Sequence, residues 1–241
     1  MTASEARFSP FGESALLVTL GDQIDVDLNR RAHLISMAAG RLRKEDPRLG
    51  RPVTGYASVL VPFDPLELDA AAVQAMLIPG VEAALEADLD AELPAASSPV
   101  AGSPVAGSPV RPRLVTVAVR YGGADGPDLD VVAALSGLRP ADVVALHAGT
   151  TYRVFMLGFA PGFAYLGPLP EELVTPRRAT PRERVPAGSV AIAGGQTAVY
   201  PFETPGGWQL IGRTERRPWD IDRRSPALLQ PGDAVRFEPL R

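Results

Sequence analysis

The sequence predicts an α+β fold in two parts, a small α/β sandwich followed by a closed β-barrel. The chain has 241 residues, which exceeds the roughly 100–150 residues of a typical single domain. A segment at residues 100–110 repeats the unit Val-Ala-Gly-Ser-Pro and divides the chain. Before it, apolar segments of strand and helix length alternate, whereas after it short apolar segments lie between Gly and Pro turns. The first pattern is typical of an α/β sandwich and the second of a barrel.

Two strands and two helices are expected in the first part. The strands are two short apolar segments, residues 14–20 and 58–63. Between them, apolar residues recur at helical spacing over residues 28–42, and Asp25 or Asp27 is the expected N-cap. A second helix is expected over residues 66–77, because Pro79-Gly80 is a stop signal.

The repeated segment predicts a linker between the two parts. Its residues offer little apolar surface to bury and Pro recurs at a fixed interval, so an extended, mobile segment is expected. We therefore place a first domain at residues 1–93, a Pro/Gly/Ser/Ala-rich linker at 94–112 and a second domain at 113–241.

The second part begins with a strand at residues 114–119. Two helical segments follow. The first covers residues 129–135 and begins after Asp128, and the second covers residues 140–147. The rest of the sequence is almost entirely of strand type. Five further segments predict strands: 153–157, 189–193, 197–202, 208–214 and 234–237. Several short strands with closely spaced turns favour a closed barrel.

The composition argues against several classes of function. The net charge is −4 and no Lys/Arg tract alternates with aromatic residues, so a nucleic-acid-binding surface is not expected. The sequence has no cysteine and only 2 histidines, which argues against disulfides and a dedicated zinc site. No apolar stretch reaches the roughly 18–20 residues of a membrane span, and the N-terminus does not resemble a secretory signal. A cytoplasmic protein without a metal site or membrane contact is expected.

A block at residues 158–214 is rich in Gly and Pro and carries a set of recognisable motifs. The motifs are Gly158-Phe-Ala-Pro-Gly-Phe-Ala-Tyr-Leu-Gly167, Thr175-Pro-Arg-Arg-Ala-Thr-Pro-Arg182, Val185-Pro-Ala-Gly-Ser-Val-Ala-Ile-Ala-Gly-Gly-Gln-Thr197 and Pro205-Gly-Gly-Trp-Gln-Leu-Ile-Gly-Arg-Thr214. With these motifs the chain resembles the KipI family, also called allophanate hydrolase subunit 1 or the B-type component of 5-oxoprolinase.

Matches outside the block extend the resemblance over almost the whole chain. They are Gly12-Glu-Ser-Ala-Leu-Leu-Val18, Tyr121-Gly-Gly123, Gly126-Pro-Asp-Leu129 and Leu229-Gln-Pro-Gly-Asp233. Two features depart from the pattern of the family. Ala164 stands where many relatives have proline, and the repetitive linker is peculiar to this sequence. Neither departure removes a polar group from the block.

The resemblance implies a ferredoxin-like or similar α/β domain at the N-terminus and a cyclophilin-like β-barrel at the C-terminus. It also implies a subunit of an ATP-dependent 5-oxoprolinase, which converts 5-oxoproline (pyroglutamate) to glutamate. The expected partners are a homologous C-type subunit and an A-type subunit, and ATP with Mg²⁺ is expected to bind to the assembled complex. The cyclophilin-like shape does not imply prolyl isomerase activity, because a fold does not determine a function.

Phosphorylation of a lactam oxygen requires groups that neutralise phosphate charge and hold an amide oxygen, such as arginines, backbone N–H groups and amide side chains. Four arginines fall in one short segment: Arg177, Arg178, Arg182 and Arg184. The glycine pairs at 194–195 and 206–207 allow backbone to approach a ligand. The expected catalytic residues are His147, Gln196 and Arg213, the last placed to point into the same cavity. The expected substrate-binding residues are Phe159, Pro161, Gly162, Tyr165, Arg177, Gly194, Gly195, Tyr200 and Trp208.

Each candidate also has a purely structural interpretation. The arginines fit a solvated rim that pairs with Glu171, Glu172 and Glu183, and the glycine pairs fit hairpin turns. The aromatic residues fit a barrel core or a subunit interface. His147 fits either a general base, since histidine titrates near neutral pH, or a structural histidine bonded to backbone.

Two other functions stay open at this point. Some members of the resembled family are described as inhibitors of a sporulation histidine kinase, and such a regulatory protein needs only an exposed apolar groove. A carboxyltransferase-like domain related to urea carboxylase is the second alternative, and it needs a biotin carrier elsewhere. The sequence contains neither a P-loop nor a Gly-x-Ser-x-Gly elbow. We therefore interpret the chain alone as catalytically incomplete, with its working site at a junction of two subunits.

Overall fold

The structure is a computed structural model that describes residues 6–89 and 113–240. The predicted linker at 94–112 lies outside the described residues. The chain divides into two compact units, Met1–Leu93 and Pro94–Arg241. In the two described ranges, no helix is long and apolar enough to cross a membrane.

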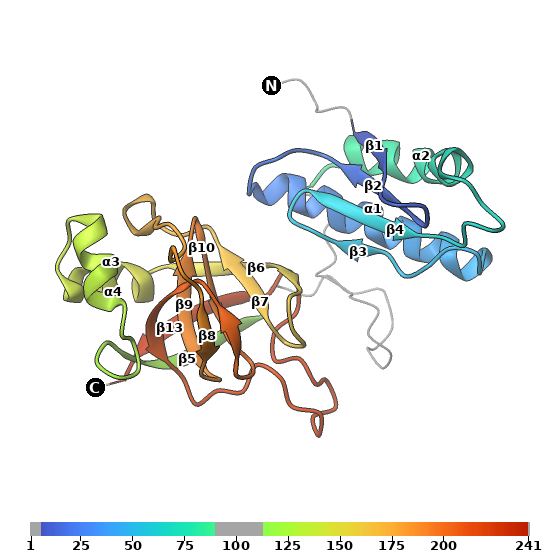
Figure 1. The fold of residues 1–241 in the computed structure, drawn as a ribbon. Helices are drawn as coiled ribbons and strands as arrows, with labels where there is room; N and C mark the ends of the chain where they lie inside the picture. Colours follow the sequence, from blue (N-terminus) through green and yellow to red (C-terminus); the bar gives the residue numbers. More distant parts are fainter. Residues whose placement is uncertain (1–5, 90–112, 241) are drawn as a thin grey trace. The chain divides into compact units, whose positions relative to one another are not determined.

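The first unit is a four-stranded antiparallel sheet with two helices packed against it (Figure 1). The strand order is β1-β2-β4-β3. The elements are β1 (Arg7–Pro10), β2 (Ala15–Thr19), α1 (Val26–Glu45), β3 (Val53–Thr54), β4 (Ser58–Pro62) and α2 (Ala70–Glu86). Leu16 on β2 pairs with Val61 on β4, and both are buried, whereas Leu17 on β2 is only half-buried. One face of the sheet therefore forms the core of the unit together with the helices.

Helix α1 begins at one of the two predicted caps. The side chain of Asp25 accepts a hydrogen bond from the backbone N–H of Leu28 at 2.8 Å. On the buried face of the helix, the Asn29 amide nitrogen donates to the carbonyl oxygens of Gly55 at 3.2 Å and Tyr56 at 2.9 Å. These two bonds hold the helix against the loop that precedes β4.

Helix α2 differs from its prediction in both position and length. It spans Ala70–Glu86 and contains Pro79, so the interpretation of Pro79-Gly80 as a stop signal was wrong. The apolar face continues past the proline through Val81 and Ala84, which are buried, and this burial outweighs the loss of one helical hydrogen bond. A Cβ on Gly80 would lie 2.8 Å from the Cβ of Ala38 on α1. The glycine therefore permits close packing of the two helices.

The second unit is built around a closed barrel with the strand order β10-β7-β6-β13-β5-β12-β9 (Figure 1). The barrel strands are β5 (Leu114–Tyr121), β6 (Thr151–Leu157), β7 (Ala164–Gly167), β9 (Ser189–Ala193), β10 (Gln196–Val199), β12 (Gln209–Arg213) and β13 (Ala234–Pro239). Outside the barrel are α3 (Leu129–Ser136), α4 (Pro140–Gly149), the short 3₁₀ helix η1 (Glu171–Leu173) and a ribbon of β8 (Arg182–Val185) with β11 (Thr204–Gly206). The predicted α+β class with a closed barrel is confirmed.

Strand β13 closes the barrel between two strands that are distant in sequence. It runs parallel to β5, with Leu114 opposite Ala234 and Val119 opposite Pro239, and antiparallel to β6. The other barrel neighbours are antiparallel.

The barrel wall separates two apolar clusters. On β9, Val190 and Ile192 belong to the core inside the barrel, whereas Ala191 and Ala193 belong to a second cluster. Because neighbouring side chains on a strand point to opposite faces, this second cluster lies on the outside of the wall. The β8–β11 ribbon contributes Val185 to it.

Candidate functional site

Aromatic rings of the second cluster, together with Phe159, which contacts two of them, form a group that we call the aromatic face: Phe159, Phe163, Tyr165, Tyr200 and Trp208. The ring centroids of Phe163 and Trp208 are 5.8 Å apart, and those of Phe163 and Tyr165 are 4.9 Å apart. Both pairs have the edge-to-face geometry that aromatic rings prefer. The strands beneath them carry small alanines on this side, which leaves room for the rings. Four of the predicted substrate-binding residues are thus brought together.

Phe159 forms the exposed edge of the aromatic face. Its side chain is 62% exposed, although its ring centroid lies 5.2 Å from that of Phe163. The φ angle of Phe159 is +66°, a left-handed conformation that costs a non-glycine residue roughly 1–2 kcal/mol. An exposed apolar ring on an unfavourable backbone is typical of a contact with a ligand or a partner.

Tyr200 anchors the aromatic face to the β8–β11 ribbon. A Cβ on Gly206 would overlap the Tyr200 hydroxyl group, so glycine is required where this hydroxyl passes the ribbon. Burial raises the pKa of Tyr200, and a backbone hydrogen bond from Trp208 and the positive charge of Arg177 oppose the rise. The tyrosine therefore stays protonated at neutral pH and presents a hydroxyl rather than a phenolate.

Arg177 lies close enough to Tyr165 and Tyr200 for its charge to act on both hydroxyl groups. Burial raises the pKa of Tyr165 as well, and the charge of Arg177 again opposes the rise. Arg177 is exposed, and its guanidinium has no hydrogen bond or ion pair to any residue of the described ranges. The structure thus places one positive charge without a counter-charge beside the aromatic face.

Gln196 lies at the rim of the same face. It begins β10, where Ala198 and Tyr200 point to the outside of the barrel, and an alternating strand places Gln196 on that side. It follows the hairpin of Gly194 and Gly195, where Gly194 has a φ of +54° and a Cβ would meet nothing within 4 Å. This glycine therefore serves the turn, as in the structural interpretation. The carbonyl oxygen of Gly195 accepts from the backbone of Leu169 at 2.9 Å.

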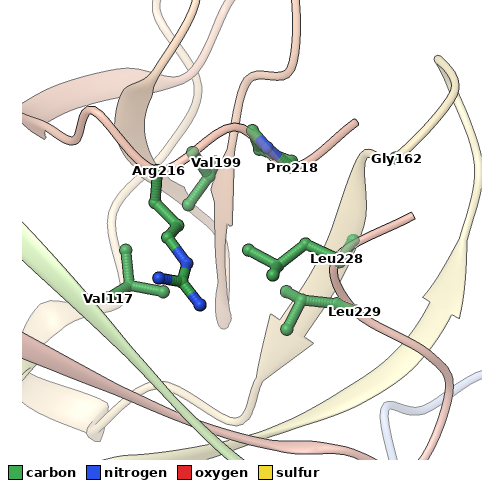
Figure 2. Close-up of a pocket in the computed structure, with 8 residues that line it drawn as sticks. Val117, Gly162, Val199, Arg216, Pro218, Leu228 and Leu229 are labelled. Atoms are coloured by element: carbon green, nitrogen blue, oxygen red, sulfur yellow. The ribbon is translucent and has the colours of Figure 1, made fainter. Parts of the chain in front are cut away.

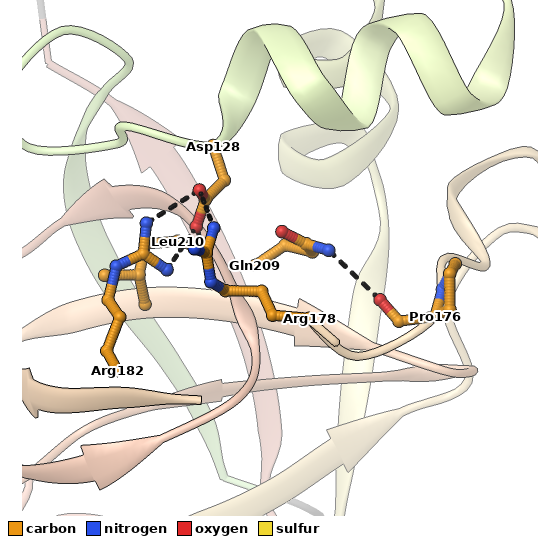
Figure 3. A network of polar contacts seen from close by, with 6 residues as sticks. All are labelled: Asp128, Pro176, Arg178, Arg182, Gln209 and Leu210. Carbon is orange, nitrogen blue, oxygen red and sulfur yellow. Dashed lines mark hydrogen bonds and ion pairs between the residues drawn. The ribbon is translucent and has the colours of Figure 1, made fainter. Parts of the chain in front are cut away.

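Two of the four arginines pair with a carboxylate that the sequence did not indicate. Asp128 is 2% exposed. Its side chain accepts from Arg178 at 3.0 Å, from both terminal nitrogens of Arg182 at 2.8 and 2.7 Å and from the backbone N–H of Leu210 at 2.7 Å (Figure 3). Arg184 instead lies 3.9 Å from Glu203 at the surface. The predicted pairing of the arginines with Glu171, Glu172 and Glu183 is absent from the ion pairs of the described ranges.

Arg213 on β12 and Gln196 on β10 lie at opposite ends of the strand between them, β9. On β9, Arg213 is opposite Ser189, whereas Gln196 is opposite Ala193. These two β9 positions are separated by about 13 Å at roughly 3.3 Å per residue. The Nε atom of Arg213 donates to the carbonyl oxygen of Ala187 at 3.1 Å. The structure therefore separates two residues that were expected to share one cavity.

His147 belongs to the interior of the barrel unit and not to the aromatic face. Its side chain is 0% exposed, and its ring stacks on that of Phe237 with the centroids 4.6 Å apart. Burial lowers the pKa of His147 to about 3. A ring that is closed off from solvent and neutral at physiological pH fits a structural role, as the alternative interpretation proposed, better than that of a general base.

Gly162 and Pro161 fall on the loop between β6 and β7. Gly162 has a φ of +79°, and a Cβ there would lie 2.8 Å from the Cβ of Trp219. It therefore packs against the 216–219 segment, whereas Pro161 is exposed. Near Gly162 is a cavity of about 10 Å³, close to the minimum for one water molecule. Figure 2 shows the Arg216 side chain reaching into it toward Val117.

The arrangement can bind a small anionic molecule with a planar group. Ring faces of Phe159 and Tyr165 offer apolar contact, Arg177 offers a charged donor, and Gln196 offers an amide. Within residues 6–89 and 113–240, no three His, Asp or Glu side chains are placed to hold a metal ion. Sequence reasoning missed Asp128 as a partner of the arginines, and its only signal was the match at residues 126–129.

Comparison with known proteins places the chain in a family. Residues 6–229 match the family described as "Carboxyltransferase domain, subdomain C and D". A protein of Bacillus subtilis (strain 168), named as the B component of 5-oxoprolinase, is 36% identical over 236 residues, which are 96% of this chain and 91% of that protein.

In two further matches the aligned region covers less than two thirds of the other protein. A protein of Escherichia coli O157:H7 with the same name is 61% identical over 129 residues, which are 54% of this chain and only 59% of that protein. The crystal structure of TTHA0988 has 34% identity and a TM-score of 0.71, and the match covers 94% of this chain but 40% of that longer chain. The resemblance inferred from the motifs is confirmed: the chain belongs to the carboxyltransferase subdomain C and D family, which it shares with proteins named as the B component of 5-oxoprolinase.

Proposed function

We propose that this chain is a subunit of an ATP-dependent 5-oxoprolinase that converts 5-oxoproline to glutamate. The names of the relatives support this proposal, and among them the Bacillus protein aligns along nearly the full length of both chains. We further propose that the chain acts in the cytoplasm with a C-type and an A-type subunit. ATP with Mg²⁺ would bind to that assembly, and the chain alone would be inactive.

The observation that carries the proposal is the position of Arg177 beside the aromatic face. 5-Oxoproline has a carboxylate on a flat five-membered lactam. A guanidinium without a counter-charge suits the carboxylate, and aromatic rings suit the faces of the lactam. Gln196 on the same rim supplies an amide for the lactam N–H or oxygen. This set of groups recognises the substrate and needs other groups to supply the phosphoryl donor.

The chemistry assigns this chain the task of holding the lactam while its carbonyl oxygen receives the γ-phosphoryl group of ATP. Phosphorylation makes the carbonyl carbon a better electrophile for water. Addition of this water and opening of the ring C–N bond, whose nitrogen takes up a proton, give an acyl phosphate. A second water hydrolyses the acyl phosphate, and the products are glutamate, ADP and phosphate. Exposed Phe159 at the edge of the aromatic face would contact the partner that closes the site.

The test is an ADP-release assay with the chain, its C-type partner and an A-type subunit purified separately and mixed. We expect ADP release that depends on 5-oxoproline and on all three proteins. Arg177→Gln should raise the KM for 5-oxoproline, whereas Arg184→Gln, a surface arginine of the same segment, should not. Absence of 5-oxoproline-stimulated ADP release from the complete mixture would reject the proposal and favour a regulatory role.

The family description favours one second candidate, a carboxyltransferase domain. This activity needs a biotinylated carrier protein as the carboxyl donor. Transfer of label from a carboxybiotinylated carrier to urea or a related acceptor, in the presence of this chain, would distinguish it from lactam opening.

A further inference from the structure

Asp128 connects three elements of the barrel unit. It lies at the start of α3, yet its side chain forms no capping bond to that helix. The carboxylate instead bonds to Arg178, Arg182 and the backbone of Leu210 (Figure 3). Its own backbone N–H donates to the Leu210 carbonyl oxygen at 2.9 Å. The segment that carries the arginines is thereby tied to both α3 and β12.

The residues on either side of Arg177 are anchored, while Arg177 itself is not. The carbonyl oxygen of Pro176 accepts from the side-chain amide of Gln209 at 3.2 Å. The backbone N–H of Arg178 donates to the carbonyl oxygen of Gly207 at 2.8 Å. The guanidinium of Arg178 reaches Asp128, whereas that of Arg177 does not, so these two neighbouring arginines point to different surroundings. The direction of Arg177 is therefore set by its anchored neighbours.

The guanidinium groups of Arg178 and Arg182 are paired with a carboxylate, whereas that of Arg177 is not paired within the described residues. The side chains of Arg178 and Arg182 are 33% and 22% exposed, and both contact a carboxylate that is nearly inaccessible to water. Charge-assisted, bidentate bonds of this kind are the stronger hydrogen bonds in proteins. An anionic ligand would have to break them to use either arginine. Arg177 needs no such exchange.

We propose that Asp128 is a positioning residue: by holding Arg178 and Arg182 it leaves Arg177 as the guanidinium that receives the carboxylate of the ligand. The identity of the ligand rests on the proposed function, whereas the division among the three arginines does not. Without the Asp128 charge, Arg178 and Arg182 would compete for the anion and the segment would lose its fixed position.

The test compares Asp128→Asn with a matched control, Asp142→Asn, in the assembled complex. Asp142 also accepts two bonds from one arginine, Arg139, at 2.7 Å each, but at the exposed start of α4. We expect Asp128→Asn to raise the KM for 5-oxoproline about tenfold with little change in kcat, as for a lost ground-state contact. Asp142→Asn should keep wild-type constants.

A double-mutant cycle with Arg177→Gln distinguishes positioning from a general structural effect. If Asp128 acts through Arg177, Asp128→Asn will add little to the KM of an Arg177→Gln complex. Fully additive effects would overturn the proposal, as would a wild-type KM in Asp128→Asn. If Asp128→Asn fails to fold by circular dichroism, Arg182→Gln carries the same cycle.

A second measurement does not depend on 5-oxoprolinase activity. In a Trp219→Phe background, Trp208 is the only tryptophan, is 5% exposed and directly follows the Gly207 carbonyl that anchors Arg178. We expect acrylamide quenching of Trp208 to increase in Asp128→Asn but not in Asp142→Asn. Unchanged quenching overturns the positioning role even if the wild-type complex proves inactive, and increased quenching with an inactive complex would reject only the proposed substrate.

Discussion

The Nε2 atom of His147 lies 2.9 Å from the hydroxyl oxygen of Thr197, and this contact fixes which ring nitrogen carries the proton. The Thr197 hydroxyl donates to the carbonyl oxygen of Ala191 at 3.1 Å, so its oxygen accepts from Nε2–H. The Nδ1 atom then accepts from the hydroxyl of Tyr121 at 2.7 Å. In this neutral tautomer both ring nitrogens have a hydrogen-bond partner. Protonation of Nδ1 would turn the Tyr121 hydroxyl from donor to acceptor and take away the acceptor of its own proton.

This relationship predicts a loss of stability in mild acid. Burial lowers the pKa of His147 to about 3, whereas an unfolded histidine has a pKa of about 6.5. As the pH falls below the unfolded value, the unfolded state gains a proton that the folded state does not. The free energy of unfolding should therefore be about 2 kcal/mol lower at pH 5.0 than at pH 7.0 from this residue alone.

Urea denaturation at the two pH values checks this prediction. His147→Gln removes the titrating ring. The fall in its free energy of unfolding between pH 7.0 and pH 5.0 should therefore be about 2 kcal/mol smaller than that of the wild type. An equal fall in the free energy of unfolding for the wild type and His147→Gln would contradict the lowered pKa of His147.

Replacement of Phe159 by glycine should separate stability from function. Glycine adopts the observed φ of +66° without strain and gains up to about 1 kcal/mol, which offsets the lost ring contacts. We expect the midpoint of urea denaturation to stay near that of the wild type, while turnover in the assembled complex falls at least tenfold. Phe11→Gly is the control, because Phe11 is 59% exposed in the first unit. A fully active Phe159→Gly complex would show that the exposed ring has no functional contact.

Gln196→Ala and Arg213→Ala should have different effects on turnover. Gln196 lies on the rim of the aromatic face, and the loss of one hydrogen bond to substrate predicts a fall of about tenfold in kcat/KM. Arg213 bonds to the Ala187 carbonyl at the other end of the wall, so its replacement should leave kcat/KM within about threefold of wild type. The reverse order in steady-state assays would move the site to the Arg213 end of the barrel.

Gly126→Ala should weaken the barrel unit strongly. A Cβ on Gly126 would overlap the carbonyl oxygen of Ile211 on β12, and backbone cannot move aside as a flexible side chain does. We expect a loss of about 1–3 kcal/mol in the free energy of unfolding. Gly149→Ala serves as the control, because a Cβ there would meet nothing within 4 Å. Equal stability of the two variants would mean that β12 can shift.

The sequence patterns predicted the longer elements and missed the shorter ones. Helix α1 has apolar residues at helical spacing over 20 residues, and strand β9 is a continuous buried run of 5 residues, so both are recognisable from the sequence. Strands β3 and β11 have only 2 and 3 residues, too few for any alternation to be visible. Pro79 misled the prediction because its cost is local, whereas the burial that compensates for it depends on the packing of α1, which no local pattern contains.

The candidate site was predictable only where a local motif indicated it. The motif at residues 158–167 indicated Phe159 and Tyr165, and in the structure both rings contact Phe163. The pairing of Asp128 with Arg182 joins residues 54 positions apart, and the burial of His147 depends on Phe237 from the closing strand. Contacts over such separations arise from topology, so residue type alone did not reveal them.

The parallel seam between β5 and β13 has a consequence for biosynthesis. During translation, β5 and β6 are both synthesised well before β13, the strand that pairs with each of them. Until that strand emerges from the ribosome, two apolar strand edges remain unpaired, and such edges promote aggregation. A nascent chain therefore exposes aggregation-prone edges over the interval between these strands, and a chain truncated before Ala234 would lack the strand that closes the barrel.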